Sequence, residues 1–142
     1  MSENNKINIS ENHKRSLSVT SRHIENSINE IEELLTNKKT DTLTEKIIRN
    51  ISEEKRNQIL SITKIIREKN QNMFNDLELN SSTLYEDRII RSRITHIWSL
   101  ICDSTSDSLK GYGVVSPQNA ELINDHVNSL LETISEIQSI IH

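Results

Sequence analysis

The sequence predicts an all-α protein that folds as an antiparallel up-and-down four-helix bundle. Only one proline and two glycines occur among its 142 residues, and both glycines fall in the same turn. A β-rich fold needs many more turn residues. Isoleucine and leucine also recur at spacings of three and four along four stretches, which is the periodicity of one helical face. We expect main helices near 11–37, 53–77, 84–110 and 117–141 in a single domain over 10–142, after a frayed N-terminus at 1–9.

The first helix is expected to begin at Glu11, because Ser10 before it is a suitable N-terminal cap. Its apolar positions lie on one helical face: Leu17, Ile24, Ile28, Ile31 and Leu35. A run of polar residues from Asn37 to Asp41 then predicts a loop.

The second helical stretch opens with Thr42 and Glu45, which have the spacing of a capping box. The pattern that follows is longer than its neighbours, and an overhanging helix in a bundle would bury nothing. Because Ser52 precedes two glutamates and resembles a helix start, we expect a short extra helix near 43–51 before the main one. One continuous helix kinked near Asn50 is the alternative that the pattern leaves open. The main helix is expected to bury Ile59, Ile62, Ile66 and Met73.

The last two helices are expected to form a hairpin. Thr83 and Glu86 have the spacing of a capping box, and the segment from Gly111 to Pro117 combines two glycines with a Ser-Pro start signal. Two helices joined by so short a connection lie antiparallel. The expected inward residues are Ile90, Ile94, Ile97, Ile101 and Leu109, then Ile123, Val127, Leu130, Ile134, Ile137 and Ile141.

Composition favours a cytoplasmic protein. The single cysteine, Cys102, excludes an internal disulfide and fits a reducing compartment. The first residues contain no apolar core of the kind that signal peptides have. No apolar run approaches the roughly 20 residues that a membrane-spanning helix needs, so we expect no membrane association.

One short motif suggests catalysis. Arg91 and His96 enclose the sequence Ser-Arg-Ile-Thr, which gives an Arg-x4-His spacing, and Ile97-Trp98 follows. These eight residues resemble the signature of the HEPN superfamily, small all-α domains that are often metal-independent ribonucleases or toxin components. The resemblance implies that Arg91 would hold the scissile phosphate and that His96 would move a proton during attack by the 2′-hydroxyl.

The sequence contains no pattern of metal or cofactor ligands, and we expect neither. No histidine has an acidic residue three positions before it, as di-iron bundles require, and there is no His-x-x-x-His and no cysteine pair. Nucleic-acid binding is less favoured than protein binding. The net charge is −4, and no aromatic residues alternate with the basic ones.

The expected function is therefore that of a non-enzymatic interaction protein, an adaptor or regulatory subunit that binds a protein partner or a second copy of itself. The last helix has no lysine or arginine, and it carries four acidic residues: Glu121, Asp125, Glu132 and Glu136. Trp98 and Tyr112 are large amphipathic residues of the kind that interfaces favour. A HEPN-like ribonuclease that uses Arg91 and His96 is the alternative.

Overall fold

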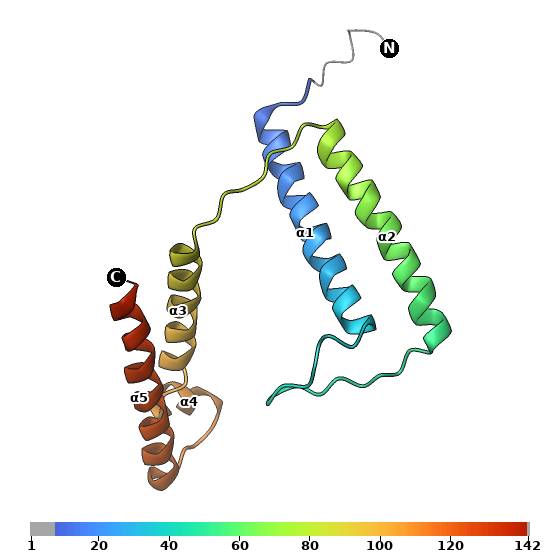
Figure 1. Ribbon diagram of the computed structural model, residues 1–142. Coiled ribbons are helices and arrows are strands. Elements are labelled where there is room, and N and C mark those ends of the chain that lie inside the picture. Colours follow the sequence, from blue (N-terminus) through green and yellow to red (C-terminus); the bar gives the residue numbers. More distant parts are fainter. Residues whose placement is uncertain (1–7, 142) are drawn as a thin grey trace, which may run out of the picture. The chain divides into compact units, whose positions relative to one another are not determined.

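The chain is all-α. The computed structural model describes residues 8–141 and contains no strand among them (Figure 1). Its elements are α1 (Glu11–Leu35), α2 (Glu53–Asp76), α3 (Glu86–Cys102), α4 (Ser106–Leu109), the 3-10 turn η1 (Lys110–Tyr112) and α5 (Pro117–Ile140). Within the described part of the chain, no helix is long and apolar enough to cross a bilayer.

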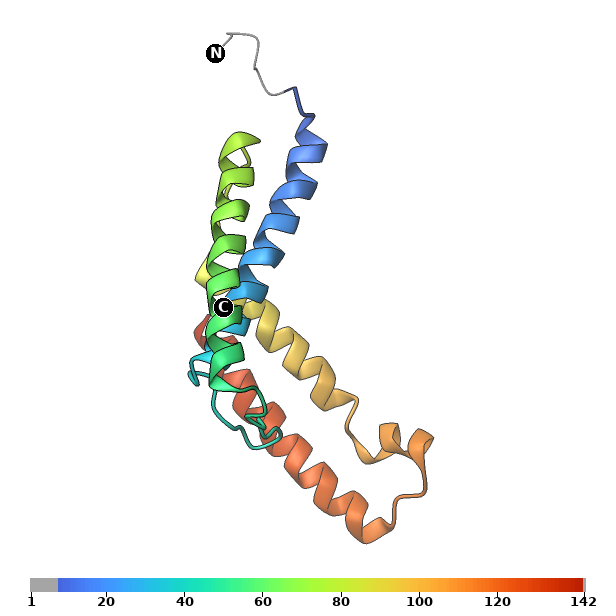
Figure 2. The same cartoon turned by 90° about the vertical axis from the view of Figure 1, so that its right-hand side faces the viewer.

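The helices belong to two compact units that divide between Ser82 and Thr83. In the first unit, α1 and α2 run antiparallel and form what we call the N-terminal hairpin; in the second, α3 and α5 do so and form the C-terminal hairpin (Figures 1 and 2). The predicted bounds of all four main helices are close to the observed ones, except at the end of α3. One packed domain over 10–142 stays a prediction. Of the N-terminus expected to fray, residues 1–7 lie outside the described part, whereas Asn8 and Ile9 have no regular structure.

Hydroxyl caps begin three of the long helices, as the sequence predicted. Ser10 Oγ accepts the N–H of His13 at 3.1 Å and begins α1. Ser52 begins α2 and Ser116 begins α5 in the same way, and Pro117 occupies the first turn of α5. Each hydroxyl satisfies an N–H that has no partner within its helix.

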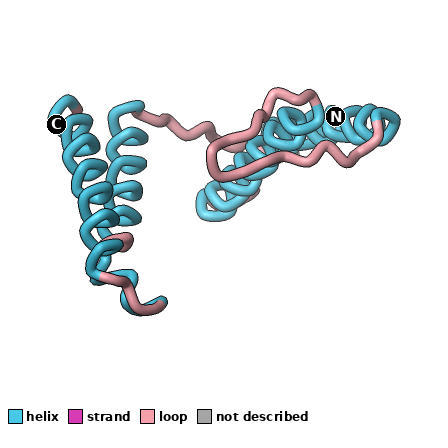
Figure 3. Tube along the Cα trace, turned by 90° about the horizontal axis from the view of Figure 1, so that it is seen from below, coloured by secondary structure: helices cyan, strands magenta, loops and turns pink. Residues whose placement is uncertain are grey.

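The predicted short helix near 43–51 is wrong, and so is the continuous helix kinked near Asn50. The loop from Thr36 to Ser52 has no helix, although the predicted cap contact between Thr42 Oγ1 and the N–H of Glu45 forms at 3.1 Å (Figure 3). The N–H of Ile47 instead donates to Asp41 Oδ1.

Arg49 explains why the loop is preferred. Its guanidinium donates to the carbonyl oxygens of Leu34 and Lys39, at 2.7 and 2.6 Å. It thereby caps the C-terminal end of α1, which has no basic residue in its last turn. A helix of two or three turns gains too little to offset its nucleation cost and the loss of these bonds.

The N-terminal hairpin is joined by polar side chains. Arg67 donates to Glu32 Oε1 and to Asn29 Oδ1, and Thr63 also donates to Glu32. Nearer the open end, Ser21 Oγ donates to Asn70 Oδ1 at 2.9 Å, and the Asn70 amide returns a bond to the Ser21 carbonyl. The buried residues of α2 are accordingly Arg56 and Thr63.

The predicted apolar face of α2 is therefore wrong at its two central positions. Ile62 is 54% exposed and Ile66 is 38% exposed, whereas Ile59 and Met73 are half-buried. On α1, Ile28 and Leu35 are buried as expected, but Ile31 is exposed. Polar residues share the buried contact between α1 and α2 with Ile28 and Leu35, and Ile31, Ile62 and Ile66 point to one side of the hairpin.

The C-terminal hairpin has an apolar centre and polar ends. Ile94 of α3 and Val127 of α5 are buried, and Ile101, Ile123, Leu131 and Ile134 are half-buried around them. Four further residues that were expected inward are exposed: Ile90, Ile97, Leu130 and Ile137. Two helices alone cannot cover so wide an apolar surface.

Two details at the ends of α3 differ from the prediction. The capping box of Thr83 and Glu86 does not form, because Tyr85 is the N-cap residue and no side chain caps the helix. The helix expected to reach residue 110 ends at Cys102. Ser104 Oγ then donates to the carbonyl of Leu100, and Thr105 caps α4, so hydroxyl groups compete with the backbone bonds of a longer helix.

The turn before α5 ends at a glycine, as expected. Gly113 has a φ of 151°, which non-glycine residues rarely adopt, and its N–H donates to the carbonyl of Lys110. Asn124 of α5 forms hydrogen bonds with Ser106 at the start of α4. Its amide accepts the N–H of Ser106 at 3.0 Å and donates to Ser106 Oγ at 2.9 Å.

Candidate functional site

Arg91 and His96 both lie on α3, but they point to different sides of it. Five residues along a helix correspond to a rotation of about 140°. Arg91 Nη2 donates to the backbone carbonyl of Ile141 at 2.8 Å, and the same atom is 4.0 Å from Asp87 Oδ2. His96 is exposed, and its imidazole makes no hydrogen bond within the described residues. The structure therefore does not bring the two side chains together on one helix face.

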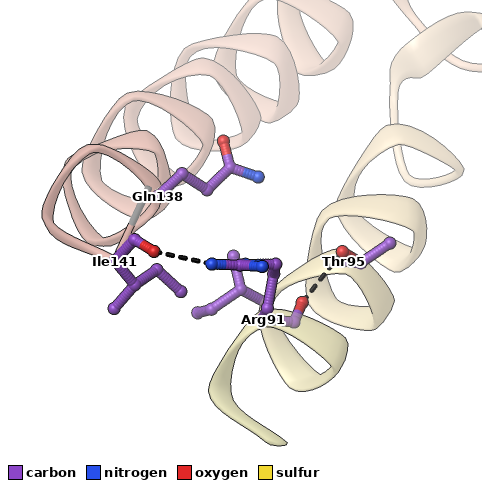
Figure 4. A pocket seen from close by; sticks show the side chains of 5 residues that line it. Arg91, Thr95, Gln138 and Ile141 are labelled. Atoms are coloured by element: carbon purple, nitrogen blue, oxygen red, sulfur yellow. Dashed lines mark hydrogen bonds between the residues drawn. The ribbon is translucent and has the colours of Figure 1, made fainter. Parts of the chain in front are cut away.

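Arg91 lines a pocket at the open end of the C-terminal hairpin. Ile94 and Thr95 of α3 also line it, with Gln138 and Ile141 across from them (Figure 4). Its volume is about 280 Å³, slightly below the 300–1,000 Å³ or so that is typical of small-molecule sites. His96 is not among the lining residues. The guanidinium is the one charged group in this lining, and its hydrogen bond to Ile141 occupies part of its donor capacity.

The described residues form no metal centre. Nowhere among residues 8–141 do three His, Cys, Asp or Glu side chains gather as the ligands of a metal ion would. Cys102, a free thiol, is half-buried at the last residue of α3. No histidine or acidic side chain in this part of the chain forms a hydrogen bond with it, so the arrangement of a cysteine nucleophile and its base is absent there.

The acidic residues predicted as a binding surface form a line along α5. Glu121, Asp125, Glu132 and Glu136 are all exposed. Their spacings of four, seven and four residues place them within roughly 60° of one another around the helix. Within residues 8–141, no lysine, arginine or histidine pairs with them. We call these four residues the acidic stripe.

The two aromatic residues predicted for binding lie in different surroundings. Trp98 lies on α3, one position after Ile97, and about a third of its surface is exposed. Tyr112 is 92% exposed at the end of η1, and Val114 beside it in the turn is fully exposed. A tyrosine and a valine so exposed bury little apolar surface within their unit, which is consistent with a role in binding.

The N-terminal hairpin has an apolar surface, and the sequence predicted that the residues of this surface would lie in the core. Seven residues compose it, and we call it the isoleucine face: Leu17, Ile24 and Ile31 of α1 with Ile59, Ile62, Ile66 and Met73 of α2. Every member is exposed or half-buried. The two apolar stripes that form this face are visible in the sequence. The sequence does not reveal, however, that polar residues contribute to the contact between α1 and α2 and leave the stripes at its side.

Comparison of the chain with models of known protein families, with curated proteins and with solved structures finds no match.

Proposed function

We propose that this protein is a non-enzymatic interaction protein, an adaptor or regulatory subunit that acts through a protein partner or a second copy of itself. The observation that carries the proposal is the number of large apolar side chains exposed on the helices. Contiguous exposed apolar patches of more than a few hundred Å² mark interaction sites in soluble proteins. Burying such surface contributes roughly 25 cal/mol per Å².

The isoleucines of both hairpins support a further statement about architecture. An antiparallel up-and-down four-helix bundle is the arrangement we propose for covering them. Each hairpin presents exposed isoleucines beside a half-buried row, on the same side of its two helices. Helices from the same chain or from a second copy would cover such faces equally well.

The acidic stripe is the surface we propose for a basic partner. Like charges along one helix repel each other by a few tenths of a kcal/mol per pair, and a partner rich in lysine or arginine would offset this. Opposite charges also accelerate encounter, so the association rate should fall as salt rises. Trp98 and Tyr112 are the aromatic residues we expect to contribute to the contact, and a single cysteine is consistent with a cytoplasmic location.

The proposal is tested by binding measurements with two charge-reversed proteins, Glu121→Lys with Asp125→Lys and Glu132→Lys with Glu136→Lys. Any protein that co-purifies with the parent in stoichiometric amount is identified, and its affinity for the parent and both variants is measured. We expect each reversal to weaken binding at least about tenfold. Binding that survives both reversals and half-molar salt would remove the acidic stripe from the proposal, and the isoleucines would remain as the surface to test.

A HEPN-like ribonuclease is the alternative function. Arg91 supports it, because its guanidinium lines a pocket in which an anionic group would find a cation. The protein would be incubated with single-stranded RNA in the presence of a chelator, beside a His96→Ala variant. Cleavage that leaves a cyclic phosphate and that is lost in the variant would favour the enzyme. If the parent does not cleave RNA, the ribonuclease is excluded and the interaction protein remains as the proposed function.

A further inference from the structure

The isoleucine face lies on a single side of the N-terminal hairpin. At 100° per residue, Ile24 and Ile31 of α1 are rotated to one side of buried Ile28, away from the polar contacts of Glu32. Around α2, Ile59, Ile62 and Ile66 are rotated in the same sense from Thr63. Because the two helices are antiparallel and face each other, equal rotations bring both stripes to the same side. The hairpin therefore has one apolar side and one polar side.

The chain also leaves this hairpin on the polar side. Arg22 Nη2 donates to Ser82 Oγ at 2.7 Å, and Arg22 lies on the opposite side of α1 from Ile24 and Ile31. Leu79 is buried, and its N–H donates to the carbonyl of Phe74. The segment after α2 is thus fixed to the back of the hairpin, and it leaves the isoleucine face uncovered.

The isoleucine face is large enough for a stable protein–protein contact. Helices of 25 and 24 residues are each roughly 36 Å long at 1.5 Å per residue. Two helices packed 8–10 Å apart present a side of about 20 Å in width, which gives a face of roughly 700 Å². Standard stable interfaces bury about 800 Å² per partner. A single helix could cover only part of this width, whereas a second hairpin would cover all of it.

The charges beside the face favour one way of pairing two hairpins. Lys55 and Lys69 border it on α2, and neither has an ion-pair partner within residues 8–141. Glu30, which Lys39 approaches to 3.2 Å, lies beyond the apolar stripe of α1. A two-fold axis parallel to the helices sets α1 against α2 of the second copy, so the lysines meet the glutamate edge. A perpendicular axis sets α2 against α2 and brings lysines together, which is unfavourable.

We propose that a second copy of this chain covers the isoleucine face. Two N-terminal hairpins pack face to face about a two-fold axis parallel to their helices and form a four-helix bundle from two α1 and two α2 helices. The inference rests on the proposed interaction function and names its partner as a second copy. The polar contacts of Arg67, Thr63 and Asn70 fix the register within each hairpin, and the isoleucines supply the apolar contact between copies.

The mass of the full chain in solution tests this, by sedimentation equilibrium from about 1 to 100 µM. We expect a dimer for the parent. Ile62→Asp with Ile66→Asp should raise the dissociation constant at least about a hundredfold, because two carboxylates would be buried without partners. Leu43→Asp with Ile48→Asp is the matched control, since both residues are exposed in the loop before α2. The control protein should remain a dimer.

A charge exchange tests the arrangement without risk to folding. Lys55→Glu with Lys69→Glu should weaken the dimer about tenfold at low salt, and the addition of Glu30→Lys should restore part of the loss. Where α2 meets α2, the reversals would only replace facing lysines by facing glutamates, so a dimer whose stability is unchanged by the two reversals would overturn the parallel axis.

Two results would overturn the second copy as occupant. One is a parent that stays monomeric at 100 µM, and the other is a dimer that persists in the Ile62→Asp, Ile66→Asp protein. In the first case, thermal melting separates this failure from that of the proposed function. If the double variant melts several degrees below the parent, the face is covered within one chain, and the apolar argument for an interaction protein fails with it. If the two proteins melt alike, the face is exposed in the free monomer, and an interaction function with a different protein partner still stands.

Discussion

The two hairpins join their helices by different means. Along the N-terminal hairpin, hydrogen bonds and an ion pair join the helices, from Ser21 and Asn70 near one end to Arg56 near the other, and Ile28 and Leu35 are buried beside them. In the C-terminal hairpin, polar contacts between the helices lie at the ends, at Arg91 and at Asn124 beside the turn, and the middle is apolar. The polar contacts are thus placed differently in the two hairpins.

This difference determines what each hairpin leaves exposed. Directional polar contacts specify which residues of two helices face each other, but each contributes only about 1 kcal/mol net. Apolar contacts contribute in proportion to buried area and specify register weakly. The N-terminal hairpin fixes its register with polar contacts along its length and buries Ile28 and Leu35, and the residues of its isoleucine face remain available for a partner. At the centre of the C-terminal hairpin, the contact is made by buried apolar residues, Ile94 and Val127.

The largest effect is expected in the apolar centre of the C-terminal hairpin. Val127→Asp would place an unpaired carboxylate at a buried position and should lower the free energy of unfolding by about 4 kcal/mol or more, which prevents stable folding of this hairpin. Leu122→Asp is the control, since Leu122 is more than half exposed on the same helix. Circular dichroism during thermal melting measures both. Equal melting temperatures would show that α3 and α5 do not depend on the contact at Val127.

A smaller effect is expected in the polar contact of the N-terminal hairpin. Arg67→Met keeps an unbranched apolar stem but leaves Glu32 without its cation, so the free energy of unfolding should fall by about 2 kcal/mol. Adding Glu32→Met removes the unpaired carboxylate and should recover most of the loss, although hairpin register should become less well defined in NMR spectra. A double variant as unstable as the single one would contradict the view that this contact mainly sets register.

A smaller effect again is expected from Asn124→Ala at the end of the C-terminal hairpin. The change removes two hydrogen bonds to Ser106 and should cost about 1–2 kcal/mol. Because the apolar centre remains, the hairpin should still form, and amide exchange should increase from Ser106 to Gly113 only. Faster exchange throughout α3 would indicate that the turn, and not the apolar centre, holds the helices together.

The smallest effect is expected in the loop between α1 and α2. Arg49→Ala removes the cap from the carbonyl oxygens of Leu34 and Lys39 and should cost about 1 kcal/mol. Arg49→Lys would keep the charge but not the paired donors, and should recover less than half of the loss. Helical content that rises in either variant would show that Arg49 alone prevents a helix near 43–51.

The starts of three of the four long helices could be predicted from the sequence because they depend on local chemistry. Ser10, Ser52 and Ser116 each cap a helix whose position follows from three or four neighbouring residues. The helix expected near 43–51 failed for the opposite reason. Its capping residue is present, but Arg49 bonds to Leu34 of α1, 15 residues earlier in the chain, and to Lys39 in the loop, and no local pattern contains the contact with α1.

The candidate binding surfaces were predicted only in part. The acidic stripe follows from helical spacing alone, so its exposed residues could be named from the sequence. Ile62 and Ile66 were assigned to the core because an apolar stripe at helical spacing usually faces a neighbouring helix. The choice of Thr63, Arg67 and Asn70 as the contacting residues depends on the partners they find on α1, and spacing within α2 does not reveal these partners.

The central claim is that a second copy of the chain covers the isoleucine face in solution. Hydroxyl-radical footprinting of the full chain tests this claim most directly. The modification rates of Ile62, Ile66 and Met73, each divided by the rate of the free amino acid, would be compared with the rate of Leu43, which is fully exposed in the loop, divided in the same way. We predict that the three face residues react at least about tenfold more slowly than Leu43 at 100 µM, and that their rates rise on dilution as the face is uncovered. Rates equal to that of Leu43 at every concentration would contradict the claim.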